Sequence, residues 1–121
     1  MDLGESLTID PDGGPPFEQV RSGIIELIRR GDLLVGQRIP TVRRLAADLD
    51  LAPNTVAKSY RELESAGVIE TRGRHGSFIK AGQDTARDRA QQATVDHVAA
   101  LRQLGIDDDA IVALVRQVVN G

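Results

Sequence analysis

The sequence predicts a mainly α-helical protein with one small β-hairpin, arranged as a winged helix-turn-helix followed by two C-terminal helices. Apolar residues recur at helical spacing in several segments of the 121-residue chain. A tight turn, Asp50-Leu51-Ala52, joins two of these segments. Two short apolar runs flank Gly73-Arg74-His75-Gly76, which is typical of a hairpin with a four-residue turn.

The composition is that of a globular chain. Hydrophobic residues make up 40% and charged residues 27%, whereas aromatic residues make up only 2%, so the core is built from Leu, Ile, Val and Ala. Cysteine is absent, which excludes disulfides and thiolate metal sites. We find no apolar run of membrane-spanning length and no signal-peptide pattern, so we expect a cytoplasmic protein.

Charge is distributed unevenly along the chain. The formal net charge is -3, yet residues 38–80 hold eight Lys and Arg against five Asp and Glu, a local charge of +3. Residues 1–37 and 81–121 are both acidic. Because a local basic face matters more for phosphate binding than the total charge does, the middle third predicts a nucleic-acid partner.

The N-terminal segment predicts a short strand at 7–10, a loop, and then a helix after Pro16. Gly31 is placed to end this helix, and Gly23 inside it indicates a close packing contact. Its apolar face comprises Phe17, Val20, Ile24, Leu27 and Ile28.

Two further helices are predicted on either side of the tight turn. The first begins near Thr41, a plausible cap, and its apolar face comprises Val42, Leu45, Ala46 and Leu49. The second has Pro53 in its first turn and Gly67 at its end. Its inward side comprises Val56, Tyr60 and Leu63.

We expect residues 1–82 to form the winged helix-turn-helix and residues 83–121 a two-helix dimerisation region. One helix runs from about Asp84 to Gly105, and the other is capped by Asp107. Neither helix can bury its apolar face and fold alone, so a partner chain is expected. Any small-molecule effector would bind at that interface or between these helices and the winged helix. The predicted interface residues are Val95, Val98, Leu101, Leu104, Ile111, Leu114, Val115 and Val118.

The helix after the tight turn has a polar side that points to DNA binding. Asn54, Lys58 and Arg61 follow i, i+4, i+7 spacing and therefore share a face. An Asn can pair with the edge of adenine, and a Lys suits guanine or a phosphate. Thr55 can reach a phosphate or a thymine methyl group. The alternative is that this is only the solvated side of an amphipathic helix.

The segment from Ile39 to Ile79 resembles the winged-helix domain of GntR-type bacterial transcription regulators. The shared motifs are Pro-Thr-x-Arg-x-Leu-Ala from Pro40, a Thr-Val pair at Thr55, Leu-Glu-x-x-Gly from Leu63, and a Gly-rich wing. The segment PPFEQV before the first long helix and the short helical tail resemble the YtrA-type branch. This resemblance implies a homodimeric repressor, often of transporter operons. We expect double-stranded DNA as its partner and no cofactor.

Residue roles follow from the resemblance only where the motifs match. The matching motifs imply that the DNA contacts include Arg43, Asn54, Thr55 and Lys58. Two departures concern the turn and the cap of the recognition helix. Asp50 replaces the usual Gly, although Asp tolerates the left-handed region, and the usual capping residue is replaced by Ala52.

The other candidate DNA contacts each have a plainer alternative. Arg43 could instead form a salt bridge to Asp48 or a neighbouring residue, and Arg38 and Arg44 could be ordinary solvated cations. Thr41 could both cap its helix and meet a phosphate. The wing tip could enter a minor groove or be only a polar turn; it comprises Arg74, His75 and Gly76.

Other classes of protein fit the sequence less well. His97 stands alone on the C-terminal segment, and helix-start charge explains the acidic run 107–109 better than a metal site does. Paired catalytic carboxylates, a His-supported nucleophile and a phosphate-binding glycine loop are not found in the sequence, so an enzyme is not expected. Two alternatives stay open: a winged helix that binds only proteins, and a degenerate partner of another DNA binder.

Overall fold

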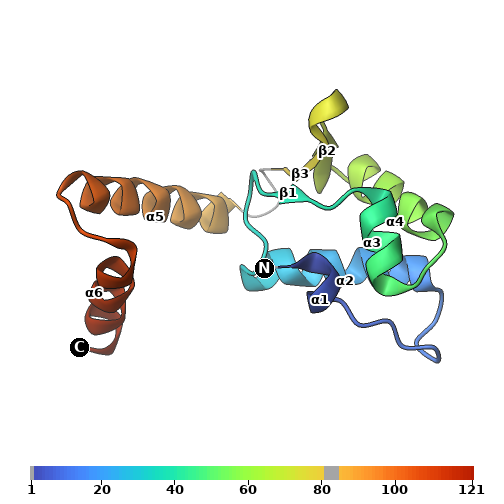
Figure 1. The fold of residues 1–121 in the computed structure, drawn as a ribbon, viewed down its shortest axis with the longest axis horizontal. Coiled ribbons are helices and arrows are strands. Elements are labelled where there is room, and N and C mark those ends of the chain that lie inside the picture. The colour runs from blue at the N-terminus through green and yellow to red at the C-terminus, as the bar shows by residue number, and fades with distance from the viewer. Residues whose placement is uncertain (1, 81–84) are drawn as a thin grey trace. The chain divides into compact units, whose positions relative to one another are not determined.

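A computed structural model describes residues 2–80 and 85–121, and its contacts divide the chain into two units, Met1–Gln83 and Asp84–Gly121. The predicted domain boundary after residue 82 and the predicted helix start near Asp84 lie outside the described residues. The predicted fold class, mainly helical with a small sheet, is confirmed (Figure 1). The helices of the first unit are α1 (Leu3–Ser6), α2 (Pro16–Arg30), α3 (Val42–Leu49) and α4 (Pro53–Ser65).

The core of the first unit lies where α4 packs against α2 and α3. Ile24, Leu45 and Leu63, one from each helix, are fully buried. The predicted end of α2 is confirmed, since Gly31 adopts φ 83° and its N–H bonds to the Ile28 carbonyl. Gly23 does mark a close contact, because a Cβ there would lie 2.5 Å from Cδ2 of Leu7.

A three-stranded antiparallel sheet completes the first unit, in the order β1-β3-β2. The predicted hairpin is β2 (Ile69–Thr71) and β3 (Ser77–Ile79), joined by the 3₁₀ turn η1 (Gly73–His75). We call residues 69–79 the wing. Strand β1 (Arg38–Ile39) was not predicted; it pairs with Phe78 and Ser77 of β3.

The predicted strand at 7–10 is wrong. These residues are described and form no strand, and the short helix α1 precedes them. Leu7 is 8% exposed, and Ile9 packs against the same core. The alternation that resembled a strand therefore comes from an extended segment whose apolar side chains reach the helices directly. Its Asp10 N–H bonds to Gln19 of α2, not to a neighbouring strand.

The second unit consists of α5 (Thr85–Gln103) and α6 (Asp108–Asn120), which pack against each other. The predicted cap of α6 is confirmed, because the Asp107 side chain accepts a 2.9 Å hydrogen bond from the Ala110 N–H. Arg102 donates to Asp108 at 3.0 Å, and this hydrogen bond raises the pKa of the Arg102 guanidinium. Ile111 is the buried hydrophobic residue of this unit, at 4% exposure.

Within the described ranges, none of the helices is both long and apolar enough to cross a membrane. The same residues hold no group of three or more His, Asp or Glu side chains that could bind a metal ion.

Candidate nucleic-acid interface

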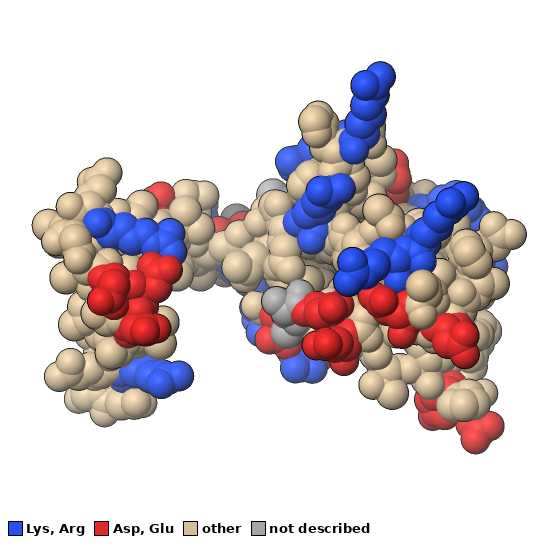
Figure 2. All heavy atoms as spheres, in the orientation of Figure 1, with Lys and Arg blue, Asp and Glu red and all other residues tan. Residues whose placement is uncertain are grey.

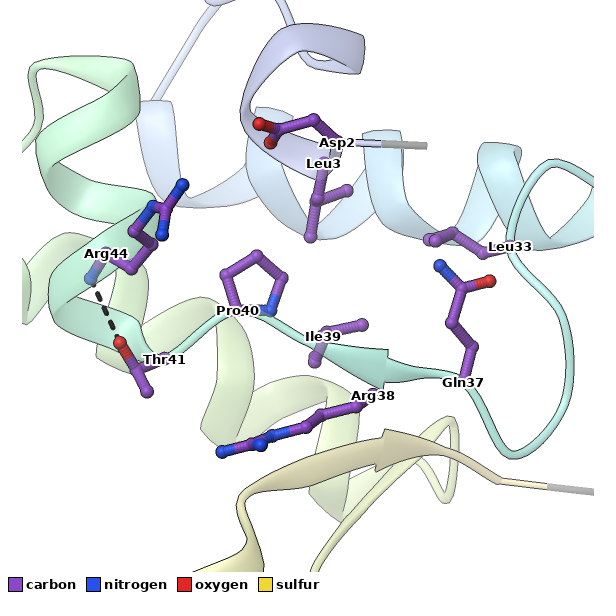
Figure 3. Close-up of a pocket in the computed structure, with 9 residues that line it drawn as sticks. All are labelled: Asp2, Leu3, Leu33, Gln37, Arg38, Ile39, Pro40, Thr41 and Arg44. Carbon is purple, nitrogen blue, oxygen red and sulfur yellow. Dashed lines mark hydrogen bonds between the residues drawn. The ribbon is translucent and has the colours of Figure 1, made fainter.

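The turn between α3 and α4 fixes how the two helices cross. Asp50 ends α3 in the left-handed region at φ 56° and ψ 46°, the conformation expected for the residue that stands in place of Gly. The Leu51 N–H then bonds to the Ala46 carbonyl at 2.9 Å and closes the turn. Thr41 caps the other end of α3 by accepting from the Arg44 N–H at 3.1 Å, as predicted (Figure 3).

Helix α4 has one buried and one exposed side. Val56, Tyr60 and Leu63 are buried, as predicted from their spacing. Asn54, Lys58 and Arg61 are exposed and share the other side of the helix. Ala52 makes no side-chain cap, Pro53 has no N–H, and the Thr55 N–H bonds to the Ala52 carbonyl at 3.0 Å. The Asn54 N–H is therefore left at the start of α4, where an anion would be favoured.

Two hydroxyl groups hold α4 in place against the rest of the unit. Ser59 is fully buried, and its Oγ donates a 2.7 Å hydrogen bond to the Phe17 carbonyl at the start of α2. Tyr60 donates a 2.6 Å hydrogen bond from its phenol to the Pro40 carbonyl, directly before the Thr41 cap. Burial raises the pKa of the Tyr60 phenol well above its usual value, so this donor keeps its proton.

A groove of about 580 Å³ lies beside the start of α3. Leu3, Leu33 and Ile39 line its apolar part, whereas Arg38, Thr41 and Arg44 lie together at its left in the view of Figure 3. The structure thus gathers three predicted DNA contacts from β1 and the first turn of α3 at one edge.

The arginines of α3 differ in their partners. Arg44 lies 3.4 Å from Asp48 in an exposed i, i+4 ion pair, which is worth little in water. Arg43 is exposed and has no ion pair within the part of the chain that the structure describes. The alternative that Arg43 pairs with Asp48 is therefore wrong: the neighbouring arginine occupies that carboxylate.

The wing presents an aromatic ring beneath a cation. The Arg72 guanidinium lies 4.3 Å from the centroid of the Phe78 ring and also donates from Nε to Glu70 at 2.8 Å. Arg38 is paired with Phe78 across the sheet. Arg72 was missed from the sequence because its place over a ring depends on the register of the strands.

Gly76 is required by the geometry of the wing. It adopts φ 99°, and a Cβ there would lie 3.0 Å from Nε of Arg38. The glycine therefore lets the Arg38 side chain lie along the wing, while Arg74 and His75 stay exposed at the tip. The four residues come together at one end of the sheet.

A second basic groove lies between α2 and α4 and was not predicted. Its lining includes Arg21, Lys58 and Arg61. Arg21 lies 3.6 Å from Glu62, close enough for an ion pair but too long for a hydrogen bond, so the buried Glu62 oxygen has no hydrogen-bond partner. Lys58 instead lies over Phe17, with its Nζ 3.8 Å from the ring centroid.

Charge is segregated on the surface of the first unit. In the view of Figure 2, basic side chains gather over the wing and α3, whereas acidic side chains gather over α1 and the loop before α2. A basic face of this kind attracts a phosphate backbone even when the whole chain is acidic.

Together, the helix-turn-helix, the exposed polar side of α4 and the basic wing define a winged helix DNA-binding protein. Residues 16–79 match the family described as "Bacterial regulatory proteins, gntR family". The chain therefore belongs to the GntR family, whose members are DNA-binding transcription regulators and not enzymes.

Two relatives align over most of the chain. The chain is 46% identical over 107 residues to the HTH-type transcriptional regulator Rv1152 of Mycobacterium tuberculosis, covering 88% of each protein. It is 35% identical over 102 residues to the HTH-type transcriptional repressor YtrA of Bacillus subtilis, covering 84% of this chain and 77% of that protein. The predicted resemblance to the YtrA-type branch is confirmed.

Solved structures agree with this assignment. YtrA from Sulfolobus acidocaldarius, a GntR-family transcription factor, superposes with a TM-score of 0.61 at 29% identity, covering 79% of this chain and 98% of that one. The AraR DNA-binding domain in complex with operator ORX1 gives a TM-score of 0.53 at 27% identity, covering 59% and 86%. The winged helix of this chain thus has the fold of a domain solved on its operator.

Proposed function

We propose that this chain is a sequence-specific transcriptional repressor that binds, as a homodimer, to an inverted-repeat operator. The observation that supports this most directly is the exposed side of α4, where Asn54, Lys58 and Arg61 lie in a row. In a helix-turn-helix protein the residues near the start of the second helix meet base edges in the major groove.

The roles of the remaining polar residues follow from their places around α4. Asn54 and Thr55 in its first turn read base edges. Positioning contacts to phosphates come from the α3 side and β1, and the wing tip enters the adjacent minor groove, where cations are favoured. The phosphate contacts are Arg38, Thr41, Arg43 and Arg44, and the wing contacts are Arg74, His75 and Gly76.

The second unit supplies the dimer contact. Val95, Leu104, Leu114, Val115 and Val118 are each at least 42% exposed, so their apolar surface is available to a partner. Val98 and Leu101 are half-buried. Ile111 differs from the rest because it is already buried, and it supports the packing of α5 and α6 rather than the contact.

The direction of regulation is inferred from a relative. YtrA of Bacillus subtilis is named a repressor, and a dimer that covers its operator can exclude the transcription machinery. We place the protein in the bacterial cytoplasm, where the chromosome lies, and the YtrA-type resemblance makes transporter operons the first place to search for the operator. A small-molecule effector at the dimer interface would act by changing the separation of the two α4 helices.

The proposal is tested by selecting bound fragments of genomic DNA and then measuring Asn54→Ala on the selected operator. Losing one paired base contact should weaken operator binding by about 1–3 kcal/mol and relax the preference at one position in each half-site. Ser65→Ala, an exposed change in the last turn of the same helix, is the matched control. An Asn54→Ala protein with unchanged affinity and selectivity would show that α4 docks differently.

The rival function is a winged helix that binds only proteins. A DNA binder should lose affinity linearly on a plot of log binding constant against log salt concentration, with a slope set by the number of phosphates contacted. A protein-binding module should retain no DNA in the selection and should show no such slope. The basic face over α3 and the wing favours the first outcome.

A further inference from the structure

Each of the two phenylalanine rings of this protein makes a cation–π contact. The chain has two Phe, one Tyr and no Trp. The Phe17 ring lies under Lys58, with 3.8 Å between Nζ and the ring centroid, and the Phe78 ring lies under Arg72. Neither ring belongs to the core, and the two cations belong to α4 and the wing, which the proposed function places on DNA.

The Phe17 ring is not part of the hydrophobic core. It is half-buried and lies outside the cluster of buried residues that forms the core. Its backbone carbonyl accepts the hydrogen bond from Ser59, but any residue at this position could provide that carbonyl. The side chain is therefore separable from the structural role of the backbone at the same residue.

We propose that Phe17 is a positioning residue that directs Lys58 toward a DNA phosphate instead of a base edge. Lys58 could read guanine only if its chain extended away from α4 into the groove. Its ammonium instead lies against the first turn of α2, at the side of α4. From that place it meets the phosphate backbone that borders the major groove, while Asn54 and Thr55 retain access to the bases.

The physical basis is preorganisation. A free lysine side chain samples many rotamers, and it loses this freedom when it binds a phosphate in one of them. A ring under the ammonium selects one of these rotamers before DNA arrives, and an exposed cation–π contact is strong enough to shift affinity by about two- to fivefold. Arg61, which shares the groove, has no ring in contact with it among the described residues.

This inference rests on the proposed docking of α4 on DNA, so its test uses the full chain and an operator selected as above. Phe17→Leu removes the ring but keeps the backbone carbonyl, and Phe17→Tyr keeps an aromatic face. Lys58→Met removes the charge while preserving the length of the side chain. Thermal unfolding of each protein separates a loss of fold from a loss of contact.

Lys58→Met should weaken binding equally on operator and unrelated DNA and should lower the salt slope by about 1. Phe17→Leu should weaken binding by about two- to fivefold, whereas Phe17→Tyr should bind as tightly as the unchanged protein. In the Lys58→Met protein, Phe17→Leu should have no further effect on binding. Additive effects, tighter binding by Phe17→Leu, or a changed base preference in Lys58→Met would each overturn the inference. Absence of DNA binding by the unchanged protein would instead reject the proposed function.

Discussion

The two units of this protein leave opposite kinds of side chain exposed. In the first unit most apolar residues of α2, α3 and α4 are buried or half-buried, and the exposed side of α4 is polar and cationic. In the second unit Val118 and Val119 are 79% and 76% exposed, and Leu104 is 76% exposed. These exposed groups support the proposed partner of each unit, which is a phosphate backbone for the first and another apolar surface for the second.

The largest effect is expected from a charge placed on the exposed apolar side of α6. Val118→Asp should prevent dimerisation and thereby lower operator affinity by about 10²–10⁴-fold, because two linked half-site contacts become one. Gln117→Asp, an adjacent exposed position, is the control and should leave both properties unchanged. Gel shifts and sedimentation measured on the same preparations would show whether the two losses occur together.

A cavity in the core of the first unit should act differently from the same truncation in the second. Leu63→Ala removes a fully buried side chain and should lower the free energy of unfolding by about 2–5 kcal/mol at every protein concentration. Leu104→Ala should lower the melting temperature mainly through the dimer, so its effect should depend on protein concentration. Calorimetry over a range of concentrations separates them, and a Leu104→Ala effect that is independent of concentration would contradict this assignment.

Much of the first unit could be predicted because its signals are local. Helices α2, α3 and α4 follow from apolar spacing, the Thr41 cap and the left-handed ends at Gly31 and Asp50. The exposed row on α4 follows from the same spacing. These features depend on residues within one or two turns of each other, so the sequence contains the information directly.

What could not be predicted depends on residues far apart in the chain. Strand β1 is two residues long and exists only because β3 lies beside it. The extended segment after α1 imitated a strand because Leu7 and Ile9 both reach the core. The contact between Phe17 and Lys58 requires α2 and α4 to pack together first.

Alkaline pH should destabilise the first unit through Tyr60. Burial raises the pKa of the Tyr60 phenol in the folded state, whereas in an unfolded chain a Tyr has a pKa of about 10. The contribution of the protonated phenol to the free energy of unfolding is therefore fully present below pH about 10. As the pH rises above that value, only the unfolded state loses this proton, and the free energy of unfolding should fall by up to about 1.4 kcal/mol per pH unit.

Tyr60→Phe provides the comparison for this pH effect. It should lower stability at neutral pH, because the Pro40 carbonyl loses its 2.6 Å donor, but its stability should fall less steeply above pH about 10. Since the chain has one Tyr, tyrosinate absorbance reports this residue alone. Ionisation of the folded protein at the ordinary pKa would contradict the burial of this phenol.

The smallest effect is expected at the start of α4. Ala52→Ser would supply the missing side-chain cap and should raise the free energy of unfolding by about 1 kcal/mol. The Ser hydroxyl would also offer one more contact to a phosphate. Chemical denaturation should detect the gain, and Ala47→Ser, an exposed site within α3, should give none.

The comparison between the units depends most on what covers α5 and α6. Sedimentation equilibrium of the full chain at micromolar concentration, without DNA, measures this directly. The account predicts a species of twice the 13.1 kDa chain mass that Val118→Asp converts to a single chain. A full-length protein that sediments as one 13.1 kDa chain throughout this range would contradict it.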